Sequence, residues 1–305
     1  MLTSFFGTSK PINFIVITIA VIAFYLLTWP FTTSVYTILE EFGILIIYLL
    51  TLGVLNFVVK RNTLTKKNTY ILFFYACFTL AMPICFKQPA VLFSGLFVLL
   101  ALRRIISLRS QLEVKKKIFD AAFWIAIASL FYFWSLLFLI VLYIGILFHG
   151  RNNYKNWLIP LAGIFVVAVL TLVYAIYTDG IIDFLLSYIE LPVFDFRPYS
   201  NIKILLPISF FLALYIWCVI KYMSLVRAVS QNLKPSYSII LASSIVALVM
   251  AVLLAPVRDG SEVYFLFGPL AIITSRYIEK SSGRWFNEML LWISLALPVI
   301  IHLLP

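Results

Sequence analysis

The chain has 305 residues, of which 64% are hydrophobic and only 11% are charged. Soluble globular proteins carry about 25% charged residues, and so apolar a chain would expose large hydrophobic patches in water. The composition excludes a soluble globular protein and predicts an integral membrane protein. The net charge of +11 does not indicate a nucleic-acid partner, because the basic residues lie at predicted helix ends and form no continuous stripe.

Nineteen of the 23 Lys and Arg residues fall into six short clusters along the chain. In order these are Lys10; Lys60, Arg61, Lys66, Lys67; Arg103, Arg104, Arg109, Lys115, Lys116, Lys117; Arg151, Lys155; Lys221, Arg227, Lys234; and Arg276, Lys280, Arg284. Each apolar stretch between clusters has room for two membrane crossings. Basic residues in short loops stay on the cytoplasmic side, so the clusters predict a cytoplasmic N-terminus.

The first spans are expected at residues 12–29 and 42–59, joined by an outer loop over 31–41. Residues 70–86 lead out again, 87–89 form a turn, and 90–102 lead back. Residues 118–149 are predicted to form a hairpin that turns near 132–135. Its limbs of about 22 Å would be short for a hydrocarbon core of about 30 Å. One tilted helix is the alternative, and it would place one basic cluster outside.

In the second half, a span is expected at residues 157–177, followed by an outer loop over 178–203. Within that loop, residues 180–190 are predicted to form an amphipathic helix in the membrane interface, with Asp183, Ser187 and Glu190 on one face. Further spans are expected at 204–220, 237–255, 263–274 and 289–304. The fold class is therefore an all-α, polytopic transmembrane helix bundle with about 11 spans. We expect a single transmembrane domain, 1–305, with its C-terminus outside.

Eight of the 12 acidic residues fall on the predicted outer face, with only four basic residues: Lys87, Arg197, Lys203 and Arg258. No ionisable residue is predicted near the middle of the membrane. Ion-coupled carriers and pumps usually carry such residues there, so this distribution disfavours both classes.

The adjacent acids Glu40 and Glu41 are the first candidates for chemistry, at the start of the second span. Adjacent side chains point about 100° apart on a helix, so at most one faces a cleft. One interpretation is a charged helix start that the helix dipole favours. The other is a catalytic general base, or a metal-binding carboxylate, next to the membrane.

The second candidate is the outer turn Arg258–Glu262, with the sequence RDGSE. It is either a polar turn with a local ion pair or a clamp in which Arg258 holds a lipid-linked phosphate. Lys87, Arg197 and Lys203 would add to such a phosphate site if the outer turns converge.

Metal and cofactor sites are not expected. His149 and His302 are the only histidines, and the predicted topology puts them on opposite sides of the membrane. The sequence contains no phosphate-binding loop, no dinucleotide-binding glycine pattern and no Gly-x-Ser-x-Gly motif.

Two resemblances extend this interpretation. The Arg103-Arg104 pair, followed by Lys115 to Lys117 and an apolar hairpin, resembles the membrane cores of polyprenyl-phosphate-sugar glycosyltransferases. That resemblance implies an acidic active-site residue in the first outer loop, at Glu40 or Glu41. The segments MLTSFF (from Met1), SKPIN (from Ser9) and FGPLAI (from Phe267) resemble a family of bacterial multi-pass inner-membrane proteins of unknown function, which implies no particular activity.

Three functions remain open. The favoured one is a non-catalytic subunit or scaffold of an envelope-biogenesis or export complex in the bacterial cytoplasmic membrane. Its partners would be the lipid bilayer and other membrane-protein subunits. The alternatives are a lipid-linked glycan transferase or polymerase acting on a polyprenyl-phosphate lipid at the outer face, and a flippase or facilitator for a lipid or solute.

Overall fold

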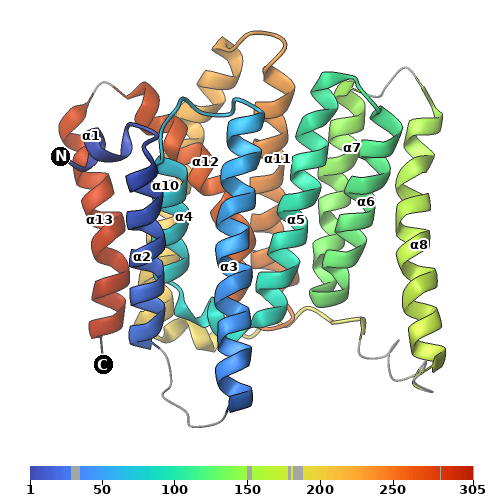
Figure 1. The fold of residues 1–305 in the computed structure, drawn as a ribbon, viewed down its shortest axis with the longest axis horizontal. Helices are drawn as coiled ribbons and strands as arrows, with labels where there is room; N and C mark the ends of the chain where they lie inside the picture. The colour runs from blue at the N-terminus through green and yellow to red at the C-terminus, as the bar shows by residue number, and fades with distance from the viewer. Residues whose placement is uncertain (29–34, 150–152, 178–179, 181–187, 282, 305) are drawn as a thin grey trace. The chain divides into compact units, whose positions relative to one another are not determined.

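A computed structural model describes residues 1–28, 35–149, 153–177, 180, 188–281 and 283–304. In this part of the chain all regular structure is helical, with twelve α-helices (Figure 1). Seven of these described helices are long and apolar enough to cross a membrane: α2, α3, α5, α8, α10, α11 with the π-helical turn that follows it, and α13. The protein is therefore all-α and, by the composition of its helices, a multi-pass membrane protein.

Two compact units divide the chain, and each gathers segments that are distant in sequence. Unit 1 contains residues 1–92, 196–228 and 259–305, and unit 2 contains residues 93–195 and 229–258. Helix α5 (Pro89–Ser107) begins in unit 1 and continues in unit 2.

The described part of unit 1 contains five long helices, a short helix at the N-terminus, a short central helix and several short turns. Its α-helices are α1 (Leu2–Phe6), α2 (Pro11–Thr28), α3 (Val35–Arg61), α4 (Tyr70–Leu80), α10 (Ile202–Ala228), α12 (Tyr264–Lys280) and α13 (Arg284–Leu303); its 3₁₀ turns are η1 (Pro83–Lys87), η4 (Arg197–Ser200) and η6 (Ser261–Val263). Every residue of α4 is buried. A helix that is apolar on all sides packs within protein, and α4 accordingly packs against α2, α3, α12 and α13.

Aromatic side chains fill the core of unit 1. Phe211 packs its ring against Phe78 and Phe267, with centroids 5.2 and 5.1 Å away. The Tyr75 hydroxyl donates a hydrogen bond of 2.7 Å to the Tyr264 hydroxyl. Buried tyrosines need such a partner, so this bond fixes the register between α4 and α12.

Unit 2 is built from α6 (Val114–Phe131), α7 (Phe138–His149), α8 (Lys155–Tyr177), α11 (Lys234–Val249) and the described turns η2 (Leu108–Ser110), η3 (Phe133–Leu137) and η5 (Met250–Leu254, π-helical), together with most of α5. Helix α6 stops where Tyr132 becomes extended, and η3 leads into α7. The chain thus breaks at the predicted turn, and one continuous helix over 118–149 is excluded. Gly163 lets α8 approach α6 closely, because a Cβ atom there would lie 2.8 Å from the Ala122 Cβ.

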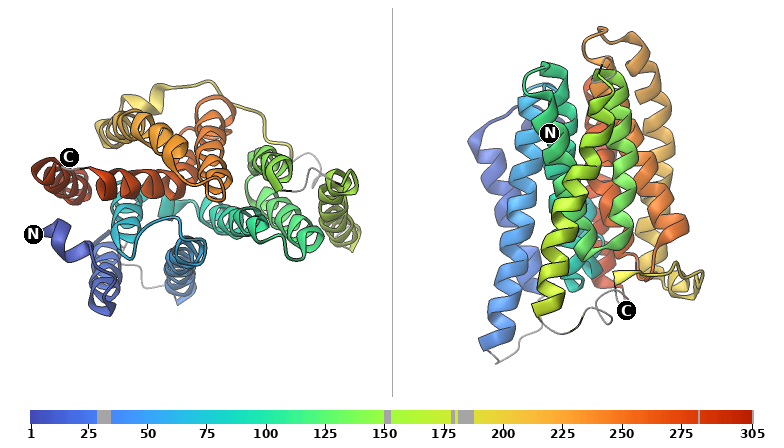
Figure 2. Two further views of the ribbon diagram at one scale, coloured as in Figure 1. Left: turned by 90° about the horizontal axis from the view of Figure 1, so that it is seen from above. Right: turned by 90° about the vertical axis from the view of Figure 1, so that its right-hand side faces the viewer.

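Within each unit, the basic clusters gather at one end of the helices (Figures 1 and 2). Acids at that end are held by cations or by the chain terminus. In unit 1, Glu279 accepts a bond from Arg276 at 2.5 Å, and Glu288 lies 3.0 Å from the N-terminal amine. In unit 2, Arg104 and Asp120 form an ion pair at 2.9 Å. The segregation of charge agrees with the predicted pattern, whereas the side of the membrane stays a prediction.

A helix occupies each of the eleven predicted spans, but several boundaries differ. Helix α4 is shorter than the predicted span 70–86, because the chain tightens into η1 after Leu80. Helix α3 begins at Val35, so Glu40 and Glu41 lie on a helix and not in the predicted loop over 31–41. Helices α4, α6, α7 and α12 fall short of the length and composition typical of a span, and the count of 11 crossings stays a prediction. The amphipathic helix expected at 180–190 falls mainly on residues outside the described part of the chain.

Candidate functional site

Glu40 and Glu41 lie on the second turn of α3, at the end of unit 1 opposite its basic clusters; Glu40 is exposed and Glu41 is half-buried. The Tyr25 hydroxyl of α2 donates a short hydrogen bond to the Glu41 carboxylate and a longer one, 3.3 Å, to its carbonyl oxygen. This contact ties the end of α2 to the start of α3. Both carboxylates therefore border solvent or headgroups, and Glu41 also has a structural contact.

Three of the predicted phosphate-binding residues lie at the same end of unit 1. Lys87 ends η1 and Arg197 begins η4, and both are exposed, whereas Lys203 on α10 is half-buried. The fold thus brings them to one end of the unit, together with Glu40 and Glu41 (Figure 1).

Arg258, the fourth predicted phosphate-binding residue, has only 3% of its surface exposed and belongs to unit 2. Its Nη1 and Nη2 atoms donate to the carbonyl oxygens of Ala251 and Val252, at 3.2 and 2.8 Å. Its Nε donates a short bond to the carbonyl oxygen of Val193. The last turn of a helix leaves carbonyl groups without partners, and an arginine near that end can satisfy them. Arg258 therefore caps η5 and also holds the loop segment around Val193.

The rest of the predicted turn, Asp259–Glu262, forms a bonded cluster within unit 1. Asp259 accepts bonds from the Ser261 hydroxyl and main-chain N–H, at 2.6 and 2.9 Å, and from the Gln88 side-chain amide at 2.9 Å. Glu262 accepts a bond of 2.9 Å from the Gly260 N–H and a short bond from the Tyr199 hydroxyl. The two carboxylates thus join η1, η4 and η6.

Gly260 makes this turn possible. Its φ of +97° lies in a region that side chains other than glycine rarely adopt. A Cβ atom there would also collide with the terminal methyl group of Met82. The turn therefore requires glycine for both conformation and space.

Glu262 has no exposed surface. Burial raises the pKa of this carboxyl group to about 7, although the bonds from Tyr199 and Gly260 act in the opposite direction; the nearby Asp259 charge raises it further. A buried carboxyl group with a pKa near neutrality can exchange a proton under physiological conditions.

Sequence reasoning missed Tyr25, Gln88 and Tyr199, the residues that hold the acids. Each reaches its carboxylate from another element of the fold, and no local sequence pattern predicts such contacts. Among the described residues, no group of three or more His, Cys, Asp or Glu side chains could hold a metal ion.

One family model matches residues 8–303, almost the whole length of the chain. The chain belongs to the family of unknown function DUF6427. Neither a curated protein nor a solved structure matches this DUF6427 member. Membership of this family therefore agrees with a multi-pass membrane protein of unknown function and indicates no particular activity.

Proposed function

We propose that this protein is a non-catalytic subunit, or scaffold, of an envelope-biogenesis or export complex in the bacterial cytoplasmic membrane. Both units would be parts of one transmembrane domain, 1–305, with about 11 crossings, a cytoplasmic N-terminus and an outer C-terminus. Its partners would be the lipid bilayer and other membrane-protein subunits.

The observation that supports this proposal is how the ionisable residues of the 258–262 turn are used. Arg258 donates to main-chain carbonyls of its own unit, while Asp259 and Glu262 accept bonds from side chains and main-chain groups of theirs. Buried charges with such partners stabilise a local structure, and removing one partner leaves the other uncompensated. The ionisable residues of this turn are thus engaged in fixing the local structure of their own units.

A lipid-linked glycan transferase is the second candidate. The exposed Glu40, the half-buried Glu41 and the exposed bases Lys87 and Arg197 lie at one end of unit 1. A phosphate held by the bases with a carboxylate general base nearby would suit chemistry on a polyprenyl-phosphate lipid. The two candidates differ in what the loss of Glu41 should do.

The test is affinity purification of the tagged chain from its native membrane in a gentle detergent, followed by mass spectrometry of proteins and lipids. The scaffold proposal predicts a stoichiometric protein partner, retained by Glu41→Gln and lost with Arg258→Ala. Loss of the guanidinium leaves carbonyl groups unpaired and should cost about 2–4 kcal/mol, so the amount of protein should fall as well. Arg258→Lys should not restore the amount of protein, because a lysine ammonium group cannot reproduce the forked arrangement of N–H donors of the guanidinium group.

The transferase candidate predicts a different result. Glu41→Gln would then fail to complement a deletion strain while its protein level stays normal, and a polyprenyl-phosphate lipid would co-purify without a protein partner. That combination would contradict the scaffold proposal.

A further inference from the structure

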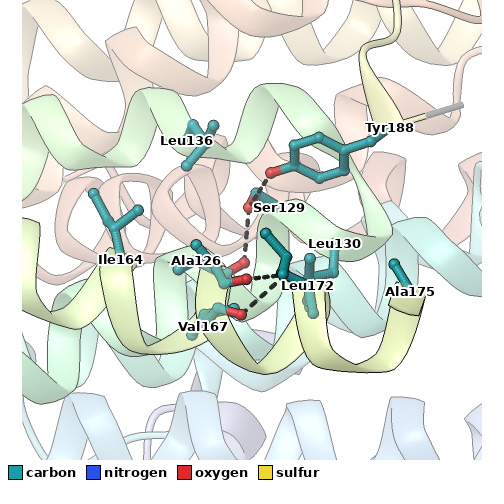
Figure 3. Close-up of a pocket in the computed structure, with 11 residues that line it drawn as sticks. Ala126, Ser129, Leu130, Leu136, Ile164, Val167, Leu172, Ala175 and Tyr188 are labelled. Atoms are coloured by element: carbon teal, nitrogen blue, oxygen red, sulfur yellow. Dashed lines mark hydrogen bonds between the residues drawn. The ribbon is translucent and has the colours of Figure 1, made fainter. Parts of the chain in front are cut away.

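Helices α6 and α8 of unit 2 enclose a groove of about 380 Å³. Figure 3 shows Ser129 and Leu130 on α6, facing Ile164, Val167 and Ala175 on α8, with Tyr188 at one end. The α8 residues that line the groove recur at the spacing of one helical face. The volume falls within the range of about 300–1,000 Å³ that is typical of small-molecule sites.

The two helices pack closely at the level of Gly163. At Gly163 a Cβ atom would lie 2.8 Å from the Ala122 Cβ and 3.0 Å from the Phe119 carbonyl oxygen. Nearer the other end of α8, the facing residues leave the cavity open. Leu130 and Leu172 are 38% and 54% exposed, so the groove also opens sideways.

The position of the groove along α8 indicates that lipid surrounds it. Helix α8 is one of the helices able to span a membrane, and the groove follows it from Ile164, near the middle of the helix, to Ala175, near its end. The 11 positions between them correspond to about 16 Å along the axis. This length is about half of a hydrocarbon core of about 30 Å, which is one leaflet. A mostly apolar groove that opens sideways from a helix able to span a membrane is placed to meet lipid chains.

The end of the groove near Tyr188 has the character of a membrane interface. The Tyr188 and Ser129 hydroxyls lie 2.9 Å apart there. Tyr174 and Tyr177, in the last turn of α8, are strongly exposed. Aromatic residues with a polar tip favour the level of the headgroups.

We propose that this groove holds one acyl chain of a membrane phospholipid, with its headgroup at the Tyr188 end and its chain terminus near Ile164. The lipid acts as a packing element between α6 and α8 in the part of unit 2 where the two helices separate. The groove thus accepts a chain from the leaflet on the Tyr188 side and excludes the other leaflet through the contact at Gly163.

Photo-crosslinking tests this proposal. The full-length protein is reconstituted in vesicles of phosphatidylethanolamine and phosphatidylglycerol that contain a phosphatidylcholine with a diazirine in one acyl chain. A diazirine near the ester should label peptides around Ala175 and Tyr188, and a diazirine at the chain terminus should label peptides around Ile164. Labelling without this gradient, or spread evenly over the exposed face of α8, would overturn the proposal.

Matched variants add a second measurement. Ala168→Trp fills the groove and should reduce labelling of the groove peptides at least fivefold. Val173→Trp introduces the same side chain on the exposed opposite face of α8 and should leave the labelling unchanged. Ala126→Leu is a milder filling variant if Ala168→Trp does not fold. Equal loss in the Val173 control, or no loss in either filling variant, would exclude the groove as the lipid site.

Discussion

Glu262 is the residue whose chemistry differs most from its ordinary behaviour. Burial raises its pKa to about 7 in the folded protein, whereas an exposed glutamate titrates near 4.3. Folding is therefore coupled to proton uptake at the Glu262 side chain between these two pKa values. The titratable groups that interact with Glu262 include Asp259, Tyr199 and Cys85.

This coupling predicts how stability depends on pH. The contribution of Glu262 is fully present below about pH 4.3 and is lost as the pH rises through about 7, because the folded state binds the proton more tightly. The thermal unfolding midpoint in detergent should therefore be lower at pH 8 than at pH 5.5. Burial also raises the pKa of Glu190, so Glu262→Gln should reduce this slope without abolishing it. A Glu262→Gln protein with the wild-type slope would disprove the assignment.

Gly260 permits a second prediction at the scale of one residue. Gly260→Ala introduces a side chain at a positive φ and against Met82, and should destabilise the protein by about 1–3 kcal/mol. Gly43→Ala is the matched control, because Gly43 lies within α3 and a Cβ atom there meets no other atom within 4 Å. Its unfolding midpoint should stay unchanged or rise slightly. Equal effects of the two substitutions would show that the turn conformation is not needed.

At the scale of the elements, apolar length and Pro or basic boundaries located a helix at each of the eleven predicted positions. The exact ends of the helices were harder to predict, since they depend on tertiary contacts. The Tyr25 hydroxyl bonds Glu41 where the sequence suggested a loop. Protein surrounds the whole of helix α4, which local hydropathy cannot distinguish from a lipid environment. The same limit applies to Arg258, whose partners Val193 and Ala251 cannot be predicted from its neighbours in the sequence.

The α6–α8 pair permits a prediction at this scale. Gly163→Leu would force the helices apart where a Cβ atom already meets Ala122 and the Phe119 carbonyl group. Overpacking of this kind typically costs about 1–3 kcal/mol. Leu161→Ala, at an exposed position of the same helix, should cost much less. The comparison is made from unfolding midpoints in one detergent, and a neutral Gly163→Leu would show that the close approach is unnecessary.

At the scale of the whole molecule, charge separation is the feature that sequence and structure share. Basic clusters gather at one end of each unit, whereas Glu40, Glu41, Asp259 and Glu262 lie at the other end of unit 1. The positive-inside rule assigns the basic ends to the cytoplasm. This assignment decides whether the exposed residues Lys87 and Arg197 meet the outer leaflet, and it underlies both candidate functions.

Topology mapping tests this central claim most directly. Reporter fusions after Glu41, Asp195 and Asp259 should be active outside the membrane, and fusions after Lys67, Lys117 and Arg227 should be active in the cytoplasm. The fusion after Asp195 is the decisive one, because it follows the short α6–α7 hairpin and the α8 span. An outside signal there would support about 11 crossings with an outer C-terminus, and a cytoplasmic signal would contradict the entire arrangement.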